Sequence, residues 1–339
     1  MEFSSEQLRG LVNAGQLYEE LKAVRVPLSK LPGGMYWRVI NSREYLYQYY
    51  TGQTGKQHTK SLGPRSDATA ALHEEFGAKK KDLLARCAGI EGRIKELAPV
   101  WRALRLPSID RQAGDILRAF DQMNFGGRNV LTIGTYALKA YEVEAATNFS
   151  TGMDATDDLD FTIIFGAVSA ATGESVMADT HDDPTGLPRQ LLLTLKRVDS
   201  SFIVSTSSPK TVVNNKGYRV DLLTSEADAR QMAGVLPWRP EGLKGQDWLH
   251  LGRPIRQIII DFQGWPVPVD APDPRYFALH KLWLGRQSTR SAAKRPKDQR
   301  QGAALLRVIK DHMPHYPLDV EFLNALPQDL RSEFEMQSS

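Results

Sequence analysis

The quartet Asp158-Leu159-Asp160-Phe161 limits the possible folds of this chain more than any other stretch. Acidic and apolar residues alternate in it, and successive side chains of a β-strand point to opposite faces of the sheet. The alternation therefore predicts a strand whose apolar side chains enter the core while Asp158 and Asp160 share the other face. Neighbouring carboxylates repel one another unless a proton or a cation lies between them, and Mg²⁺ prefers oxygen ligands. The quartet thus indicates a metal-binding strand.

The same pattern returns later in the chain, at Tyr218-Arg219-Val220-Asp221-Leu222. A strand here would bury Val220 and Leu222 and place Asp221 on the face opposite to them. If the two predicted strands are neighbours in one sheet, three acids meet. Three carboxylates are the smallest ligand set for a two-metal site that transfers phosphoryl or nucleotidyl groups.

A possible phosphate site precedes these strands, at Ile133-Gly134-Thr135. A short β-rich run ends here and a helical pattern begins. Gly134 allows a close approach of the backbone, and Thr135 can cap the helix. The free N–H groups and the positive dipole end of a helix N-terminus favour phosphate. A Gly-Thr pair at a helix start is common as an ordinary cap, so its meaning comes from its combination with the two acidic strands.

Together these three segments resemble the polymerase-β-like nucleotidyltransferase superfamily. That pattern is a hydrophobic residue and Gly followed by Gly, Ser or Thr, then an acid-hydrophobe-acid strand, then a third acid. More narrowly, the chain is similar to a bacterial nucleotidyltransferase-fold family of unknown substrate and to toxin-type nucleotidyltransferases of the AbiEii kind. The similarity covers roughly residues 129–307, and its motifs lie at residues 134–142, 156–160, 272–281 and 297–298. The 24-residue separation of Gly134 and Asp158 exceeds the usual spacing, which an inserted loop at residues 147–155 would explain.

The resemblance implies a role for each matching residue. Asp158, Asp160 and Asp221 would bind Mg²⁺ or Mn²⁺, and Asp221 would also help to activate the attacking hydroxyl. Gly134 and Thr135 would hold the triphosphate of a nucleoside triphosphate such as ATP.

The resemblance also implies that Lys281 neutralises phosphate charge. The alternative is a solvent-facing lysine on a helix. Arg219 could serve only as an ion-pair partner of Asp221. Residues 286–300 hold six basic residues and one acid, a balance that suits either a triphosphate, an RNA backbone or a solvated surface.

The order of predicted elements is helices, a mixed sheet and helices again, which indicates the α+β class. We expect an N-terminal extension with a small antiparallel sheet and long helices at residues 1–125, a catalytic core at 126–270 and a helical region at 271–339. Strands are predicted at residues 35–41, 44–50, 56–62, 129–133, 158–165, 190–199, 202–205, 218–224, 255–262 and 267–269. Helices are predicted at residues 5–26 (ended by Pro27), 66–98, 110–123, 136–146, 225–233, 274–284, 297–312 and 320–325.

The composition is that of an ordinary folded protein: of 339 residues, 41% are hydrophobic and 24% are charged. The apolar runs are too short to cross a membrane, and the N-terminus has no basic start followed by an apolar run. The single cysteine, Cys87, excludes an internal disulfide and a cysteine-based zinc site. We expect a cytoplasmic protein without a membrane partner.

The small predicted sheet is rich in tyrosine and interleaves Tyr45, Tyr47, Tyr49 and Tyr50 with Arg43 and Lys56. Tyrosines in strands usually pack, but aromatic rings with cations can also stack on nucleotides. The first 130 residues carry 20 Lys and Arg against 14 Asp and Glu.

The leading hypothesis is a metal-dependent nucleotidyltransferase that acts on a hydroxyl of RNA (including tRNA), a protein or a small molecule. One alternative treats Asp158-Leu159-Asp160 as the metal motif of a sugar-nucleotide glycosyltransferase, which leaves Gly134-Thr135 and Asp221 unexplained. Another is a non-catalytic module of the same fold that binds nucleic acid through its basic N-terminal half.

Overall fold

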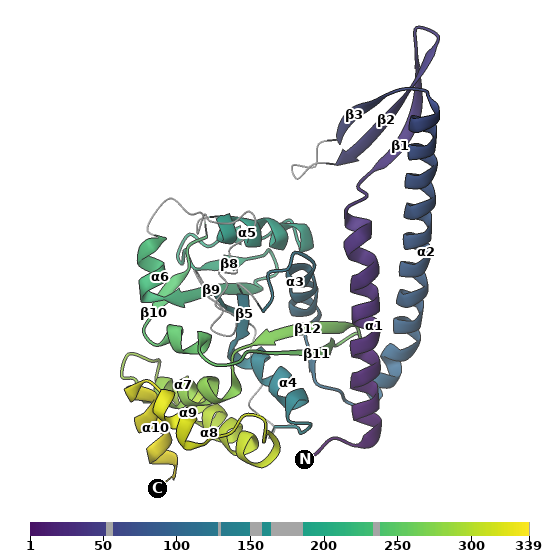
Figure 1. Cartoon of the computed structure of the whole chain (residues 1–339). Coiled ribbons are helices and arrows are strands. Elements are labelled where there is room, and N and C mark those ends of the chain that lie inside the picture. The colour runs from purple at the N-terminus through teal and green to yellow at the C-terminus, as the bar shows by residue number, and fades with distance from the viewer. Residues whose placement is uncertain (52–56, 128–129, 150–157, 164–185, 233–237, 339) are drawn as a thin grey trace. The chain divides into compact units, whose positions relative to one another are not determined.

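A computed structural model describes residues 1–51, 57–127, 130–149, 158–163, 186–232 and 238–338 (Figure 1). The chain separates into two units by its internal contacts. The first combines Met1–Gly15 with Val100–Ser339, and the second is Gln16–Pro99. Each unit is described by itself below.

The Gln16–Pro99 unit is a three-stranded antiparallel sheet with two long helices. Its elements are α1 (Ser5–Ser29), β1 (Gly34–Ile40), β2 (Arg43–Thr51), β3 (Gln57–Pro64) and α2 (Asp67–Ala103), with α1 and α2 each continuing into the other unit. One sheet face packs on α2, because Leu46 is fully buried and the Trp37 ring lies 5.8 Å from that of His73. The predicted small sheet is confirmed. The prediction that Pro27 ends the first helix is wrong. Proline removes one hydrogen bond from the last turn, and α1 ends only after Ser29.

The larger unit is built on a mixed sheet in the order β5-β6-β9-β8-β7, with β10 also paired to β9. β6 and β9 run parallel, and β5 is antiparallel to β6. These strands are β5 (Val130–Ile133), β6 (Asp158–Ile163), β7 (Ile203–Val204), β8 (Thr211–Val213), β9 (Arg219–Ser225) and β10 (Glu241–Leu243). The helices between them are α3 (Arg111–Gln122), α4 (Gly134–Glu144), α5 (Gly186–Val198) and α6 (Glu226–Gln231).

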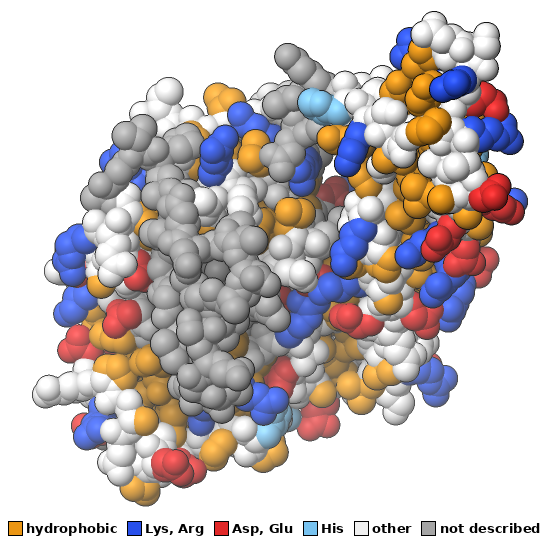
Figure 2. Space-filling model, turned by 45° about the horizontal axis from the view of Figure 1, so that its top comes forward, with side chains coloured by type: hydrophobic (Ala, Val, Ile, Leu, Met, Phe, Trp, Pro, Cys, Tyr) orange, Lys and Arg blue, Asp and Glu red, His pale blue; other side chains and the backbone are white. Residues whose placement is uncertain are grey.

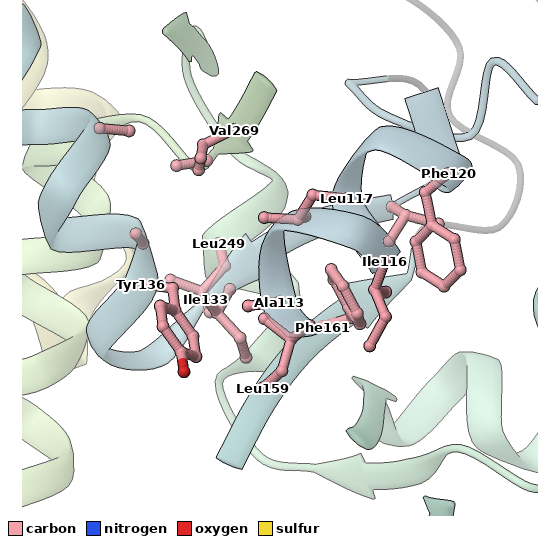
Figure 3. Packing of buried hydrophobic residues seen from close by; sticks show 14 of the residues in the cluster. Ala113, Ile116, Leu117, Phe120, Ile133, Tyr136, Leu159, Phe161, Leu249 and Val269 are labelled. Carbon is pink, nitrogen blue, oxygen red and sulfur yellow. The ribbon is translucent and has the colours of Figure 1, made fainter. Parts of the chain in front are cut away.

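The core of this unit lies against one face of that sheet. Leu159 and Phe161 of β6 point toward α3, where Figure 3 shows them beside Ala113, Ile116 and Phe120. The rings of Phe120 and Phe161 are 5.0 Å apart. Asp110 fixes the start of α3, since its Oδ1 accepts a 2.9 Å hydrogen bond from the backbone N–H of Ala113.

The strand predicted at residues 190–199 is wrong, because these residues belong to helix α5. Leu187, Leu191 and Leu195 recur every four residues, which places all three on one helical face, and all are buried in the core. Leucine also has a high helix propensity, unlike the β-branched residues that favour strands. A run of consecutive apolar residues hides this periodicity.

A second sheet and the C-terminal helices complete the unit. The sheet has the order β12-β11-β4, and the elements are β4 (Ser108–Ile109), the 3₁₀-helix η1 (Gln246–His250), β11 (Ile255–Asp261), β12 (Pro266–Ala271), α7 (Pro274–Arg286), α8 (Arg295–His312), α9 (Val320–Ala325) and α10 (Gln328–Ser338). The sequence analysis did not predict β4, β8, β10, η1 or α10. The observed mixture of helices with mixed sheets confirms the α+β class.

The chain start belongs to this larger unit through backbone and side-chain hydrogen bonds. The Phe3 N–H donates to the Ala146 carbonyl over 2.8 Å, and the Gln7 side chain donates to the Leu104 carbonyl over 3.0 Å. Within the described residues, no helix has the length and apolar character needed to cross a membrane.

Candidate active site

The two predicted acidic strands are direct neighbours. β6 and β9 pair in parallel with Asp160 opposite Asp221, and Asp158 opposite Arg219. On the other face of these strands, Leu159, Phe161, Val220 and Leu222 are buried in the core. Because side chains alternate, burial of this apolar set directs Asp160 and Asp221 to the opposite face. Neighbouring strands lie about 4.8 Å apart, so two carboxylates in register can share one cation.

Gly134 brings the start of α4 against the Asp160 carboxylate. β5 pairs with β6 so that Ile133 lies opposite Asp160, and the helix begins at the next residue. Gly134 has a positive φ of 70°, and a Cβ at this position would lie 2.7 Å from Oδ2 of Asp160. Only glycine therefore fits here without strain. The predicted Gly-Thr corner and the predicted acidic strand meet.

The N-cap residue of α4 supplies no side-chain cap. Ile133 is the N-cap residue and makes no side-chain hydrogen bond to the helix, and Thr135 lies buried within the turn. Backbone N–H groups at such an end need an acceptor, and a phosphate group supplies one.

Thr211 and Lys210 hold Asp221, and the sequence analysis did not identify either residue. The Thr211 hydroxyl donates a 2.7 Å hydrogen bond to Oδ1 of Asp221, and Nζ of Lys210 lies 4.0 Å from its Oδ2. Lys210 also forms an ion pair with Glu241. The β-branched run Thr211–Val213 is compatible with a strand, and it forms β8 beside β9, but it does not indicate that these side chains contact Asp221.

A cavity of about 660 Å³ lies beside the Gly134 corner, with Thr135, Tyr136 and Lys139 of α4 in its wall. Tyr136 and Tyr218 both donate hydrogen bonds to Oδ2 of Asp110, the second over 3.4 Å. Burial, with Tyr136 and Asp110 nearby, raises the pKa of Tyr218 well above its ordinary value, so this hydroxyl stays protonated. The volume falls in the range of small-molecule sites.

Lys281 lies in α7 and is held in a buried ion pair. Its Nζ lies 2.8 Å from Oδ1 of Asp298, and Nε of Arg290 lies 2.8 Å from the other oxygen, Oδ2. Burial opposes ionisation of Asp298, but the charge of Lys281 and the hydrogen bond from Arg290 outweigh it and lower the pKa of Asp298. Lys281 is therefore not the solvent-facing lysine of the alternative interpretation, because it is buried and paired with Asp298. Its assignment to phosphate stays a prediction.

Some predicted features fall outside the described part of the structure. The backbone of Asp158 is placed in β6, but its side chain is not described, and residues 150–155 of the predicted inserted loop are not described at all. Among the side chains that are described, no group of three or more His, Cys, Asp or Glu could hold a metal ion. The described part thus supplies two carboxylates in register, with Asp158 two residues before one of them.

The comparisons with known proteins agree with this geometry. A family model described as nucleotidyltransferase matches residues 111–327, which is more than half of the chain. The match begins at α3 and includes the Gly134 corner, both acidic strands and Lys281. Searches of curated proteins and of solved structures found no match. The chain therefore belongs to the nucleotidyltransferase family and is an enzyme.

Proposed function

We propose that this enzyme transfers a nucleoside monophosphate from a nucleoside triphosphate to a hydroxyl acceptor, in a metal-dependent reaction that releases pyrophosphate. One observation carries the proposal: Asp160 and Asp221 lie in register on parallel strands, with the Gly134 corner against Asp160. Carboxylates suit divalent cations and a helix start suits phosphate, so both halves of a metal–triphosphate complex have a binding group here.

The residues present fit Mg²⁺ or Mn²⁺ as the cofactor. The donors of Asp160 and Asp221 are carboxylate oxygens, the hard ligands that these ions prefer, and they lie on one sheet face. Asp158 would be the third ligand. When bound, the metal would neutralise charge on the phosphates and lower the pKa of a coordinated hydroxyl.

The protein's own groups would then orient the reactants. N–H groups at the start of α4 would hold the triphosphate, and Asp221 would take the proton of the acceptor hydroxyl. The acceptor oxygen would form a bond to the α-phosphorus as the bond from that phosphorus to the bridging oxygen breaks, and pyrophosphate would leave with that oxygen. Thr211 and Lys210 would keep Asp221 in one orientation, since each contacts a different carboxylate oxygen.

The acceptor hydroxyl would belong to RNA (including tRNA), a protein or a small molecule. The cavity beside Thr135 has room for a nucleotide-sized ligand.

The decisive assay incubates the protein with each of the four α-³²P-labelled triphosphates, Mg²⁺ or Mn²⁺, and candidate acceptors. We expect label transfer that a chelator abolishes and that Asp160→Asn or Asp221→Asn lowers by roughly 10²- to 10³-fold, because metal sites supply several kcal/mol of transition-state stabilisation. Asp247→Asn, an exposed aspartate in η1, is the matched control and should retain activity.

Transfer that survives both site substitutions, or no transfer to any acceptor, would refute the proposal. Turnover of sugar nucleotides in place of triphosphates would instead favour the glycosyltransferase alternative.

A further inference from the structure

The outer face of the small sheet in the Gln16–Pro99 unit displays a row of tyrosines. Tyr36 of β1 and Tyr45, Tyr47 and Tyr49 of β2 share one face, because Tyr36 pairs with Tyr47 and side chains alternate along both strands. Tyr36 and Tyr49 are 38% and 37% exposed. Their rings are neighbours, with centroids 5.9 Å apart for Tyr36–Tyr47 and 6.1 Å apart for Tyr36–Tyr49. This set of four tyrosines is called the tyrosine face below.

The tyrosines of this face are not needed for packing against α2. The opposite sheet face supplies the buried contacts, through Leu46 and through Trp37, whose ring lies beside His73 of α2. Aromatic side chains that pack in a sheet are normally on the buried face, so four tyrosines on the other face need a different explanation.

The charge around the tyrosine face is positive. Residues 30–66 contain six Lys and Arg and a single acid, Glu44. Glu44 belongs to the opposite face, between Arg43 and Tyr45, and forms an ion pair with Arg65. Arg38 and Arg43 share the face with the tyrosines by strand alternation, and the Arg38 guanidinium lies 5.8 Å from the Tyr47 ring. At the upper right of Figure 2, basic and acidic side chains both lie beside hydrophobic side chains, a class that there includes tyrosine.

We propose that the tyrosine face binds single-stranded nucleic acid. Exposed aromatic rings stack on unpaired bases, and arginines beside them neutralise the phosphates. A duplex offers its bases only at their edges, so stacked rings on an open sheet favour a single strand. The tyrosine face belongs to the Gln16–Pro99 unit and the proposed catalytic residues belong to the other unit, so this proposal does not depend on nucleotidyl transfer.

The test measures binding to the full-length protein by fluorescence anisotropy, in EDTA and without triphosphate. The probes are a fluorescein-labelled 12-nucleotide single-stranded RNA, the DNA of the same sequence, and the matching DNA duplex. We expect both single strands to bind more tightly than the duplex, and the better of the two identifies the sugar that the site prefers. Because this assay contains no metal and no triphosphate, failure of the transfer assay and failure of this proposal are distinguishable.

The strand offers a matched control. Tyr36→Ala should weaken binding by about 5- to 150-fold, which corresponds to the ~1–3 kcal/mol of one stacked base at 1.4 kcal/mol per tenfold. Tyr36→Phe should bind like the wild type, because it keeps the ring. Tyr50→Ala should also leave binding unchanged, because Tyr50 is equally exposed, at 37%, but follows Tyr49 on the opposite face and stacks on His58.

The logarithm of the association constant falls linearly with the logarithm of the salt concentration, and Arg38→Gln should make this slope shallower by about 0.7. That is the contribution of one phosphate contact in a single strand. Circular dichroism confirms that each variant is folded. The proposal is overturned by tighter binding to the duplex, by an undiminished affinity of folded Tyr36→Ala, or by an equal loss in Tyr50→Ala.

Discussion

Gly134 is the residue at which the candidate site tolerates the least change. Its backbone has a φ of 70°, and a Cβ would lie 2.7 Å from the carboxylate of Asp160. A side chain at this position would therefore both strain the backbone and displace Asp160, a proposed metal ligand.

Gly134→Ala should abolish most activity and destabilise the fold by about 1–3 kcal/mol, the range for strained backbone conformations. Gly89→Ala is the control, since Gly89 lies within α2 and a Cβ there meets no atom within 4 Å. The control should be neutral or stabilising by up to about 1 kcal/mol, because alanine favours helix. Urea unfolding and the label-transfer assay check both variants. Full activity in Gly134→Ala would show that Asp160 need not stay where the structure places it.

At this scale the sequence predicted part of the site and missed part. The strands of Asp160 and Asp221 and the helix start at Gly134 could be predicted because their patterns are local, whereas their meeting was expected only from the resemblance to nucleotidyltransferases. Thr211 and Lys210 could not be predicted, since a hydrogen bond between neighbouring strands depends on sheet order and leaves no periodic signal.

At the scale of elements, α7 and α8 are joined by the buried cluster of Lys281, Asp298 and Arg290. The side chain of Asp298 is only 3% exposed and that of Lys281 only 10%. A buried charge that loses its partner is strongly unfavourable.

Asp298→Asn should lower the free energy of unfolding by about 3–5 kcal/mol, because it leaves two cations with a neutral partner. Asp329→Asn, which breaks the exposed pair with Lys244, should cost at most about 1 kcal/mol. Urea titration measures both. If both substitutions lowered the free energy of unfolding equally, the burial of Asp298 would be contradicted.

Lys281→Met separates the two roles of this lysine. If it binds phosphate as predicted, KM for the triphosphate rises beyond what the loss of stability explains. If its role is only to pair with Asp298, stability falls and KM is unchanged.

The secondary structure shows where local pattern fails as a guide. The acidic strands were predicted correctly because alternating acidic and apolar residues fit only a strand. The prediction of a strand at α5 was wrong because consecutive leucines are compatible with both the two-residue period of a strand and the 3.6-residue period of a helix. The short strand β8 is defined by its pairing with β9 and β7, which a local pattern does not contain.

At the scale of the whole molecule, burial of histidine links stability to pH. Complete burial, with the charge of Lys281 next to it, lowers the pKa of His280 to about 3 from an ordinary 6.5. As the pH falls below about 6.5, the unfolded chain binds a proton here that the folded chain does not, so acid destabilises the fold.

His280→Gln should therefore reduce the loss of stability on acidification. Between pH 5.5 and 4.5 the free energy of unfolding of the wild type should fall by up to about 1.4 kcal/mol more than that of the variant. This is the change over one pH unit when the unfolded state binds one proton more than the folded state. Urea unfolding followed by tryptophan fluorescence at these two pH values measures the difference. Equal losses in both proteins would show that His280 is protonated in the folded state.

The parallel pairing of β6 with β9 also determines which insertions and deletions the enzyme can survive. The position of Asp221 opposite Asp160 is fixed by the buried side chains on the other face of the two strands, which include Leu159 and Val220. Loss of one residue within β9 would exchange its inner and outer faces and bring an aliphatic side chain to the reaction centre. A change of length in the turn at residues 214–217, just before the strand, leaves that order intact. Such a change would instead alter the wall of the cavity beside Thr135, because Asn214, Lys216 and Gly217 line it.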